Sequence, residues 1–154
     1  MITKTKYNQT TISKKVSLDG VGLHTGKDVT LTFYPSESNT GYVFKRVDLE
    51  GEPIVEADIN YVTNTERGTC LNKNNVIIQT CEHVLASLVG LQIDNALIEL
   101  NASEPPIMDG SSKYFVEALE KAGIKQLNDK RKEFVVKKVI SFKEKSEWLL
   151  ETKY

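Results

Sequence analysis

The stretch of residues 79–110 constrains the fold more than any other, because a helical repeat, an apolar strand and a proline-marked loop follow one another there. Within residues 80–91 the apolar side chains recur with the i, i+3, i+4, i+7 spacing of one buried helix face, at Cys81, Val84, Leu85 and Leu88. Thr80 is the expected N-cap, and Glu82 lies in the first turn, where the helix dipole favours a negative charge. We therefore predict a helix that leads directly into a strand.

The opposite face of this helix carries small side chains and no Lys, Arg or Asp, at His83, Ala86, Ser87 and Gly90. Helices turn charged faces to water, so an uncharged face of this kind predicts a second layer packed against it. His83 would then lie between two layers, at a helix N-terminus whose dipole disfavours the imidazolium. A neutral imidazole can bind a divalent metal, or it can simply be a hydrogen-bonded residue in a packed seam. The helix by itself leaves both interpretations open.

Length and charge narrow the classes of function. A chain of 154 residues makes one domain, or one domain and the start of another. Its net charge of −1 argues against an electrostatic nucleic-acid binder. Because it has neither an apolar run of about 18 residues nor the apolar core of a signal peptide, we expect a cytoplasmic protein without a transmembrane segment. Cys70 and Cys81 are too few for a disulfide framework and fit ordinary small apolar positions.

The remaining pattern predicts an α+β domain of two layers, a mostly antiparallel sheet with two helices packed on one face. A second helix is expected to start at Ser111 or Ser112 and to end at Gly123. Residues 93–100 have few polar positions and should form a central strand. The other expected strands are residues 10–18, 29–34, 42–47 and, more weakly, 54–62, together with a hairpin of residues 70–71 and 76–78.

Two polar connections are candidate parts of a site. Residues 19–28 contain three glycines that permit close backbone approach, so His24 is held on a tight connection. The glycine spacing does not match a phosphate-binding loop, and no helix follows it. His24 therefore either shapes the turn or lies at a site. Residues 63–68, which include Arg67, form a polar loop that could be the edge of a site.

The end of the chain has a different pattern. The basic cluster of residues 130–132 is expected to be a solvated connector. Residues 134–142 and 148–154 are predicted to form a two-stranded hairpin that has no partner elements after it. We therefore interpret residues 1–130 as one domain and residues 131–154 as the opening hairpin of a truncated second domain.

Four segments, none specific alone, form a specific combination: GVGLHTGK at residues 20–27, TCL at 69–71, TCEHVLASLVGLQIDNALIEL at 80–100, and PIMDGSS at 106–112. In this order they resemble the N-terminal domain of the LpxC family, the UDP-3-O-acyl-N-acetylglucosamine deacetylases. The resemblance implies two domains, each a sheet with two helices, whose helices pack between the sheets. This chain would then be one half of a β-α-α-β sandwich.

The resemblance also implies a chemistry, the zinc-dependent removal of acetate from UDP-3-O-acyl-N-acetylglucosamine in lipid A biosynthesis. His83 matches the histidine that binds zinc in the family, and Glu82 matches the general base. Neighbouring helix residues point about 100° apart, which allows one to bind the metal while the other reaches a water on it. The resemblance gives no role to His24, Arg67 or Thr80, which remain possible site-lining residues.

The chain lacks other parts of the family pattern. The family completes its zinc site with H-K-x-x-D and uses a further histidine as general acid, but the only histidines here are His24 and His83. The resemblance thus implies that this chain supplies the general base and one zinc ligand, with the other ligands in a missing second domain, and that it is inactive alone.

Two alternatives remain open. The chain could be a stand-alone, non-catalytic binding domain that uses the small-residue helix face as a partner interface. Self-association through that face or through the terminal hairpin is then expected. A weaker alternative is a self-contained zinc site of His83, His24 and either Cys70 or Cys81, although their spacing has no structural-zinc pattern.

Overall fold

A computed structural model describes residues 2–66, 68–143 and 149–152. Residues 9–129 form one compact unit, and the described residues before and after them form a second unit. Arg67 and Trp148 lie outside the described residues. Among the described residues no helix is both long and apolar enough to cross a membrane.

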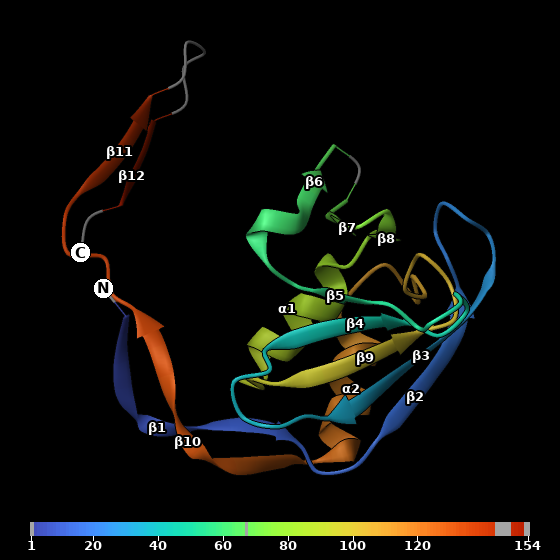
Figure 1. Ribbon diagram of the computed structural model, residues 1–154, viewed down its shortest axis with the longest axis horizontal. Helices are drawn as coiled ribbons and strands as arrows, with labels where there is room; N and C mark the ends of the chain where they lie inside the picture. The colour runs from blue at the N-terminus through green and yellow to red at the C-terminus, as the bar shows by residue number, and fades with distance from the viewer. Residues whose placement is uncertain (1, 67, 144–148, 153–154) are drawn as a thin grey trace. The chain divides into compact units, whose positions relative to one another are not determined.

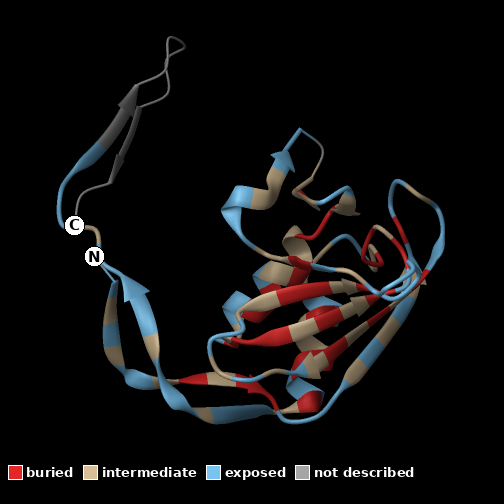
Figure 2. Ribbon diagram, viewed as in Figure 1, coloured by how far each residue is buried: buried red, intermediate tan, exposed pale blue. Residues whose placement is uncertain are grey.

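The larger unit is built on a five-stranded sheet (Figure 1). Its strands, in spatial order, are β2 (Val16–Val21), β3 (Asp28–Pro35), β9 (Ala96–Leu100), β4 (Tyr42–Arg46) and β5 (Ile54–Glu56). Every pairing is antiparallel except that of β4 with β9. The predicted central strand is confirmed, since β9 is the third of the five and alternate residues of it are buried (Figure 2).

Two helices, α1 (Glu82–Gly90) and α2 (Lys113–Ala122), cover one face of this sheet (Figure 1). The sheet and the helices meet in a single apolar core, where the rings of Phe33 and Phe115 contact edge to face with centroids 6.5 Å apart. The predicted α+β fold of two layers is therefore confirmed. The expected helix end is also confirmed, because Gly123 caps α2 with φ of 75°.

The start of α1 differs from the prediction. Cys81 occupies the N-cap position, and Thr80 precedes it with φ of 52°. A left-handed backbone is incompatible with an N-cap, so the expected capping role of Thr80 is wrong. The hydroxyl of Thr80 instead donates a hydrogen bond to Glu104.

The second face of α1, which carries the small side chains, also differs from the prediction. Ser87 is buried and its hydroxyl donates to the carbonyl of Val84, whereas Ala86 and Gly90 are exposed. Val89, beside them, is 63% exposed. The prediction that α1 is buried on both sides is therefore wrong for the described part of this chain, in which Ala86, Val89 and Gly90 are exposed.

A small three-stranded sheet of β6 (Val62–Asn64), β7 (Cys70–Lys73) and β8 (Val76–Ile78) leads the chain to α1. The predicted β7–β8 hairpin is confirmed, and it turns at Asn74 and Asn75, which both have positive φ as a two-residue hairpin turn requires. Residues 54–62 are not one strand, because the 3₁₀ helix η1 (Ile59–Tyr61) interrupts them. The Asp58 side chain caps η1 by accepting from the amide of Asn60.

The remaining strands correct several boundaries. β1 (Ile2–Ile12) pairs with β10 (Ile124–Phe134), so residues 10–18 are not a single strand and the basic residues 130–132 lie in a strand rather than a connector. The chain bends after β1, where the amide of Ser13 donates to the carbonyl of Gly123. A terminal hairpin exists, with β11 (Ile140–Lys143) antiparallel to β12 (Leu149–Thr152), but it starts later than predicted.

Candidate functional site

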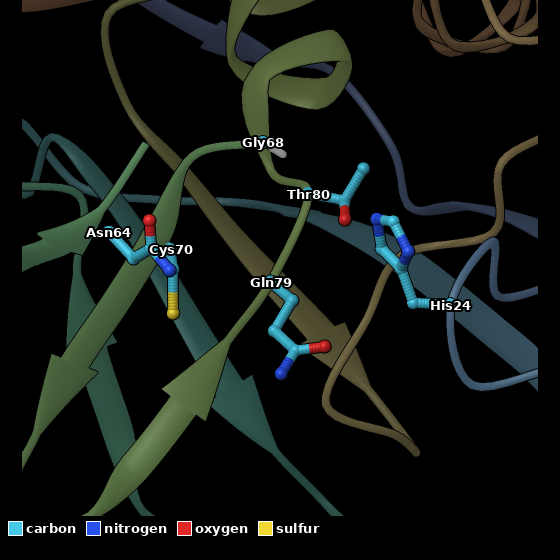
Figure 3. A pocket seen from close by; sticks show the side chains of 6 residues that line it. All are labelled: His24, Asn64, Gly68, Cys70, Gln79 and Thr80. Carbon is cyan, nitrogen blue, oxygen red and sulfur yellow. The ribbon is translucent and has the colours of Figure 1, made fainter. Parts of the chain in front are cut away.

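A pocket of about 270 Å³ lies where β6, β7 and the β8–α1 connection meet the loop after β2. Six residues line it: His24, Asn64, Gly68, Cys70, Gln79 and Thr80. Figure 3 shows the His24 ring and the Thr80 side chain close to each other on one side of this pocket. The structure thus brings together two of the three residues that the sequence suggested as site-lining, and the third, Arg67, lies outside the described residues.

The carboxylate of Glu82 borders this pocket through Gly68. Its Oε2 accepts a hydrogen bond of 2.8 Å from the amide of Thr69. A Cβ on Gly68 would lie 3.2 Å from Oε1, and the φ of Gly68, 144°, is one that glycine favours. Within the described part of the chain, no hydrogen bond to Oε1 is found. One oxygen of Glu82 is therefore anchored, while the other is available to a substrate or a water.

His83 follows on the first turn of α1 and is half-buried. Its carbonyl accepts a hydrogen bond of 3.0 Å from the Ser112 hydroxyl, which ties the beginning of α1 to the beginning of α2. The ring does not line the pocket of His24 and Thr80. The Ser112 hydroxyl thus fixes the backbone of His83 from the beginning of α2.

The described residues do not form a complete metal site. No three His, Cys, Asp or Glu side chains of residues 2–66, 68–143 and 149–152 come together closely enough to hold a metal ion. Zinc sites in proteins use three or four protein ligands. A self-contained site of His83, His24 and a cysteine is therefore wrong, and His83 fits zinc only as a single ligand that needs others from elsewhere.

Glu104, which was not predicted from the sequence as a site residue, lies in the connection between β9 and α2 and is fully buried. Its Oε1 accepts from the Thr80 hydroxyl at 2.8 Å, and its Oε2 accepts from the amides of His24 at 3.0 Å and Thr25 at 3.1 Å. Burial alone would raise the pKa of this carboxyl, but the hydrogen bonds from Thr80, Thr25 and His24 outweigh burial and hold the pKa below its usual value. Glu104 is therefore ionised at neutral pH.

Glycines at the end of β2 and in the loop after it make this arrangement possible. A Cβ on Gly20 would lie 2.8 Å from Cβ of Pro106, and one on Gly22 would lie 2.8 Å from Oε2 of Glu104. The amides of Gly22 and Gly26 close the turn by hydrogen bonds to the carbonyls of Lys27 and Gly22. The expected close backbone approach is confirmed, and it holds His24 at the pocket.

Cys81 lies directly before Glu82 and is fully buried. Burial, reinforced by the charge of Glu82, raises the pKa of its thiol to about 12. The thiol donates to the carbonyl of Thr69 at 3.4 Å. Cys81 is therefore a neutral structural thiol at physiological pH.

We expect iodoacetamide at pH 8 to modify Cys70 and to leave Cys81 unmodified in the folded chain, because thiolates react and a thiol with a pKa of about 12 is protonated at this pH. Peptide mass spectrometry of the alkylated chain measures both sites. Alkylation in denaturant is the control, in which both cysteines should react. Equal modification of both in the folded chain would contradict the burial of Cys81.

Comparisons with known proteins find similarity over most of this chain. The family model described as "LpxC: UDP-3-O-acyl N-acetylglycosamine deacetylase" matches residues 9–152. A UDP-3-O-acyl-N-acetylglucosamine deacetylase of Geobacter sp. (strain M21) is 44% identical over 133 residues, which cover 86% of this chain and 44% of the relative. The corresponding enzyme of Blochmanniella floridana is 44% identical over 91% of this chain and 48% of its own length.

A "Bifunctional enzyme LpxC/FabZ" of Bacteroides thetaiotaomicron is also 44% identical, over 138 residues, which cover 90% of this chain and 30% of the relative. The chain thus spans between about a third and a half of the length of these curated relatives. Each similarity covers most of this chain and one part of a longer protein.

Proposed function

This chain belongs to the LpxC family of UDP-3-O-acyl N-acetylglycosamine deacetylases, and on that premise we propose that it is the N-terminal part of a longer zinc-dependent deacetylase. The proposed reaction is hydrolysis of the 2-acetamido group of UDP-3-O-acyl-N-acetylglucosamine, with release of acetate, in lipid A biosynthesis. The observation that carries the proposal is the Glu82 carboxylate at the start of α1, next to His83.

Glu82 acts as the general base in this proposal. Its Oε2 is fixed by the Thr69 amide, so Oε1 can accept a proton from the water that attacks the acetamido carbonyl carbon. A carbon–oxygen bond forms to give a tetrahedral carbon, and the carbon–nitrogen bond then breaks. The nitrogen takes up a proton and leaves as the free amine, and the acetyl group leaves as acetate.

His83 acts as one zinc ligand. Zinc supplies Lewis acidity, which polarises the amide carbonyl. Since the described residues bring no second and third ligand near His83, we propose that the other ligands belong to residues outside this chain. The isolated chain is then inactive. Residues 131–154, which contain the end of β10 and the hairpin of β11 and β12, would open the domain that completes the site.

The exposed face of α1 supports the same proposal. Val89 is 63% exposed, and Ala86 and Gly90 beside it are exposed and uncharged. In the longer protein this face would pack against the second domain. The same face also supports the alternative, a non-catalytic domain that binds a partner there, so the two functions must be separated by measuring metal and activity.

Removal of loosely held metal gives the first test. After dialysis against a weak chelator, we expect the 154-residue chain to retain well below one zinc per molecule, because one histidine is too few ligands. The longer protein should retain about one zinc and lose it on replacement of His83 with Ala. Zinc content is measured by plasma mass spectrometry on the same samples as acetate release.

His24→Ala in the longer protein is the matched control, since it removes the other histidine of residues 1–154 and should leave the zinc content unchanged. Stoichiometric zinc in the isolated chain would show that His83 finds its other ligands locally or across a dimer, against the proposal. A longer protein that binds no zinc and releases no acetate would favour the non-catalytic alternative.

A further inference from the structure

We propose that Glu104 is a positioning residue of this site, because one buried carboxylate joins the His24 loop to the turn from which Glu82 and His83 project. The inference deepens the proposed function and rests on it for the roles of Glu82 and His83. The hydrogen-bond geometry that carries it stands independently of the reaction.

Among the described residues the partners of the Glu104 carboxylate are hydrogen-bond donors rather than a cation. Among the described residues the ion pairs are five, and none of them includes Glu104. Burying a carboxylate is costly unless it is hydrogen-bonded, and an apolar residue at position 104 would leave the Thr80 hydroxyl and the amides of His24 and Thr25 without this acceptor. What Glu104 provides that an apolar side chain could not is a fixed acceptor for donors from two distant segments.

The first of these donors fixes the turn before α1. Thr80 is β-branched, and its φ of 52° is one that such residues rarely adopt. Its hydroxyl donates to Oε1 of Glu104 at 2.8 Å, while the amides on either side of it, of Gln79 and Cys81, donate to the carbonyls of Ser103 and Thr69. The turn is thus held from both flanks and through its side chain. The helix α1 begins at Glu82, two residues after Thr80, so the direction of α1 depends on this turn.

The second set of donors fixes the His24 loop. The amides of His24 and Thr25 both donate to Glu104. A Cβ on Gly22 would collide first with the Thr25 hydroxyl and would also lie 2.8 Å from Oε2 of Glu104, so glycine allows this close approach. His24 and Thr80 line the same pocket, next to Gly68, which touches Glu82. One carboxylate therefore sets two walls of the pocket at once.

Gln in place of Glu104 cannot accept hydrogen bonds from both the Thr80 hydroxyl and the amides of His24 and Thr25. Its carbonyl oxygen can accept from the Thr80 hydroxyl, but its NH₂ group then faces two backbone amides that are themselves donors. Val in place of Thr80 keeps the β-branched shape and removes only the hydroxyl, and Ser keeps the hydroxyl. These three variants separate the contact of Glu104 with the Thr80 turn from its contact with the His24 loop.

The first measurement is NMR of the full 154-residue chain, in which the two histidines give a simple set of ring signals. Glu104→Gln should shift the signals of His24, Glu82 and His83 and reduce the exchange protection of the His24 and Thr25 amides about 5- to 10-fold relative to core amides. Thr80→Val should shift Glu82 and His83 and leave His24 close to wild type. Thr80→Ser should restore the wild-type pattern.

Glu120→Gln is the matched control, because it makes the same charge change at an exposed position of α2. The inference is overturned if Glu104→Gln or Thr80→Val shifts Glu82 and His83 no more than this control does. If Glu104→Gln does not fold, the contrast between Thr80→Val and Thr80→Ser decides the outcome.

The second measurement uses the longer protein. A displaced general base lowers kcat more than substrate affinity, so Thr80→Val should reduce kcat about 10- to 100-fold with KM within about twofold, and Thr80→Ser should recover the rate. Equal rates for Thr80→Val and Thr80→Ser would contradict the inference. Failure of the proposed function would appear differently, as an active Glu82→Gln enzyme, and would leave the NMR result unaffected.

Discussion

Replacement of Glu82 with Gln is expected to lower the kcat of the longer protein by about 10²- to 10⁴-fold, the usual contribution of a general base. Gln has the same shape, and its carbonyl oxygen can still accept from the Thr69 amide that holds Oε2 at 2.8 Å. It cannot take a proton from water at neutral pH. The zinc content should therefore stay at the wild-type level, which separates loss of the base from loss of the metal. Acetate release and plasma mass spectrometry measure the two quantities.

Glu66→Gln is the matched control for this change. Glu66 is an exposed acid of the polar loop that precedes Gly68, and its backbone amide, not its carboxylate, makes the loop's hydrogen bond to Asn64. The activity of Glu66→Gln should remain within about twofold of wild type, because its exposed carboxylate makes no hydrogen bond or ion pair among the described residues and substitutions of such side chains have small effects. Wild-type kcat in Glu82→Gln would refute the proposed role of Glu82, whatever the zinc content.

Replacement of Phe33 with Ala is expected to cost about 3–5 kcal/mol of the free energy of unfolding. Phe33 is fully buried in β3, and its ring meets that of Phe115 from α2 edge to face. The change removes this aromatic contact between the sheet and the helix layer and leaves a cavity in the core. Because domains of this kind are stable by only about 5–15 kcal/mol, the loss is a large share of the total. The loss of free energy of unfolding is measured by urea unfolding of the full chain, from the midpoint of the transition of residues 9–129.

Phe134→Ala supplies the control for the same chemical change. Phe134 is 73% exposed, so its removal should change the free energy of unfolding by no more than about 0.5 kcal/mol. Similar losses for the two variants would contradict the placement of the core. A double-mutant cycle of Phe33 with Phe115 should give a coupling of about 0.5–1.5 kcal/mol, the usual value for an aromatic pair.

Local patterns in the sequence determined several parts of this protein. The helix that ends at Gly123 and the hairpin that turns at Asn74 and Asn75 were predictable, because each depends on neighbouring residues and their backbone preferences. The two layers followed from the pattern of expected strands and helices, and the central place of β9 followed from its few polar positions. The position of Glu82 and His83 side by side on the first turn of a helix was also predictable, since it depends only on consecutive residues.

Only the tertiary structure decided the surroundings of these two residues. Thr80 looked like an N-cap by its type, but its hydroxyl is used by Glu104, 24 residues away, and its backbone is left-handed. No local pattern marks Glu104 as part of a site, yet it is fully buried and accepts a hydrogen bond from the amide of His24, 80 residues earlier. Periodicity and capping rules describe neighbours along the chain, whereas the burial of a carboxylate depends on which distant amides reach it. The sequence therefore determined the elements and the candidate chemistry, and the packing of distant loops decided what holds that chemistry in place.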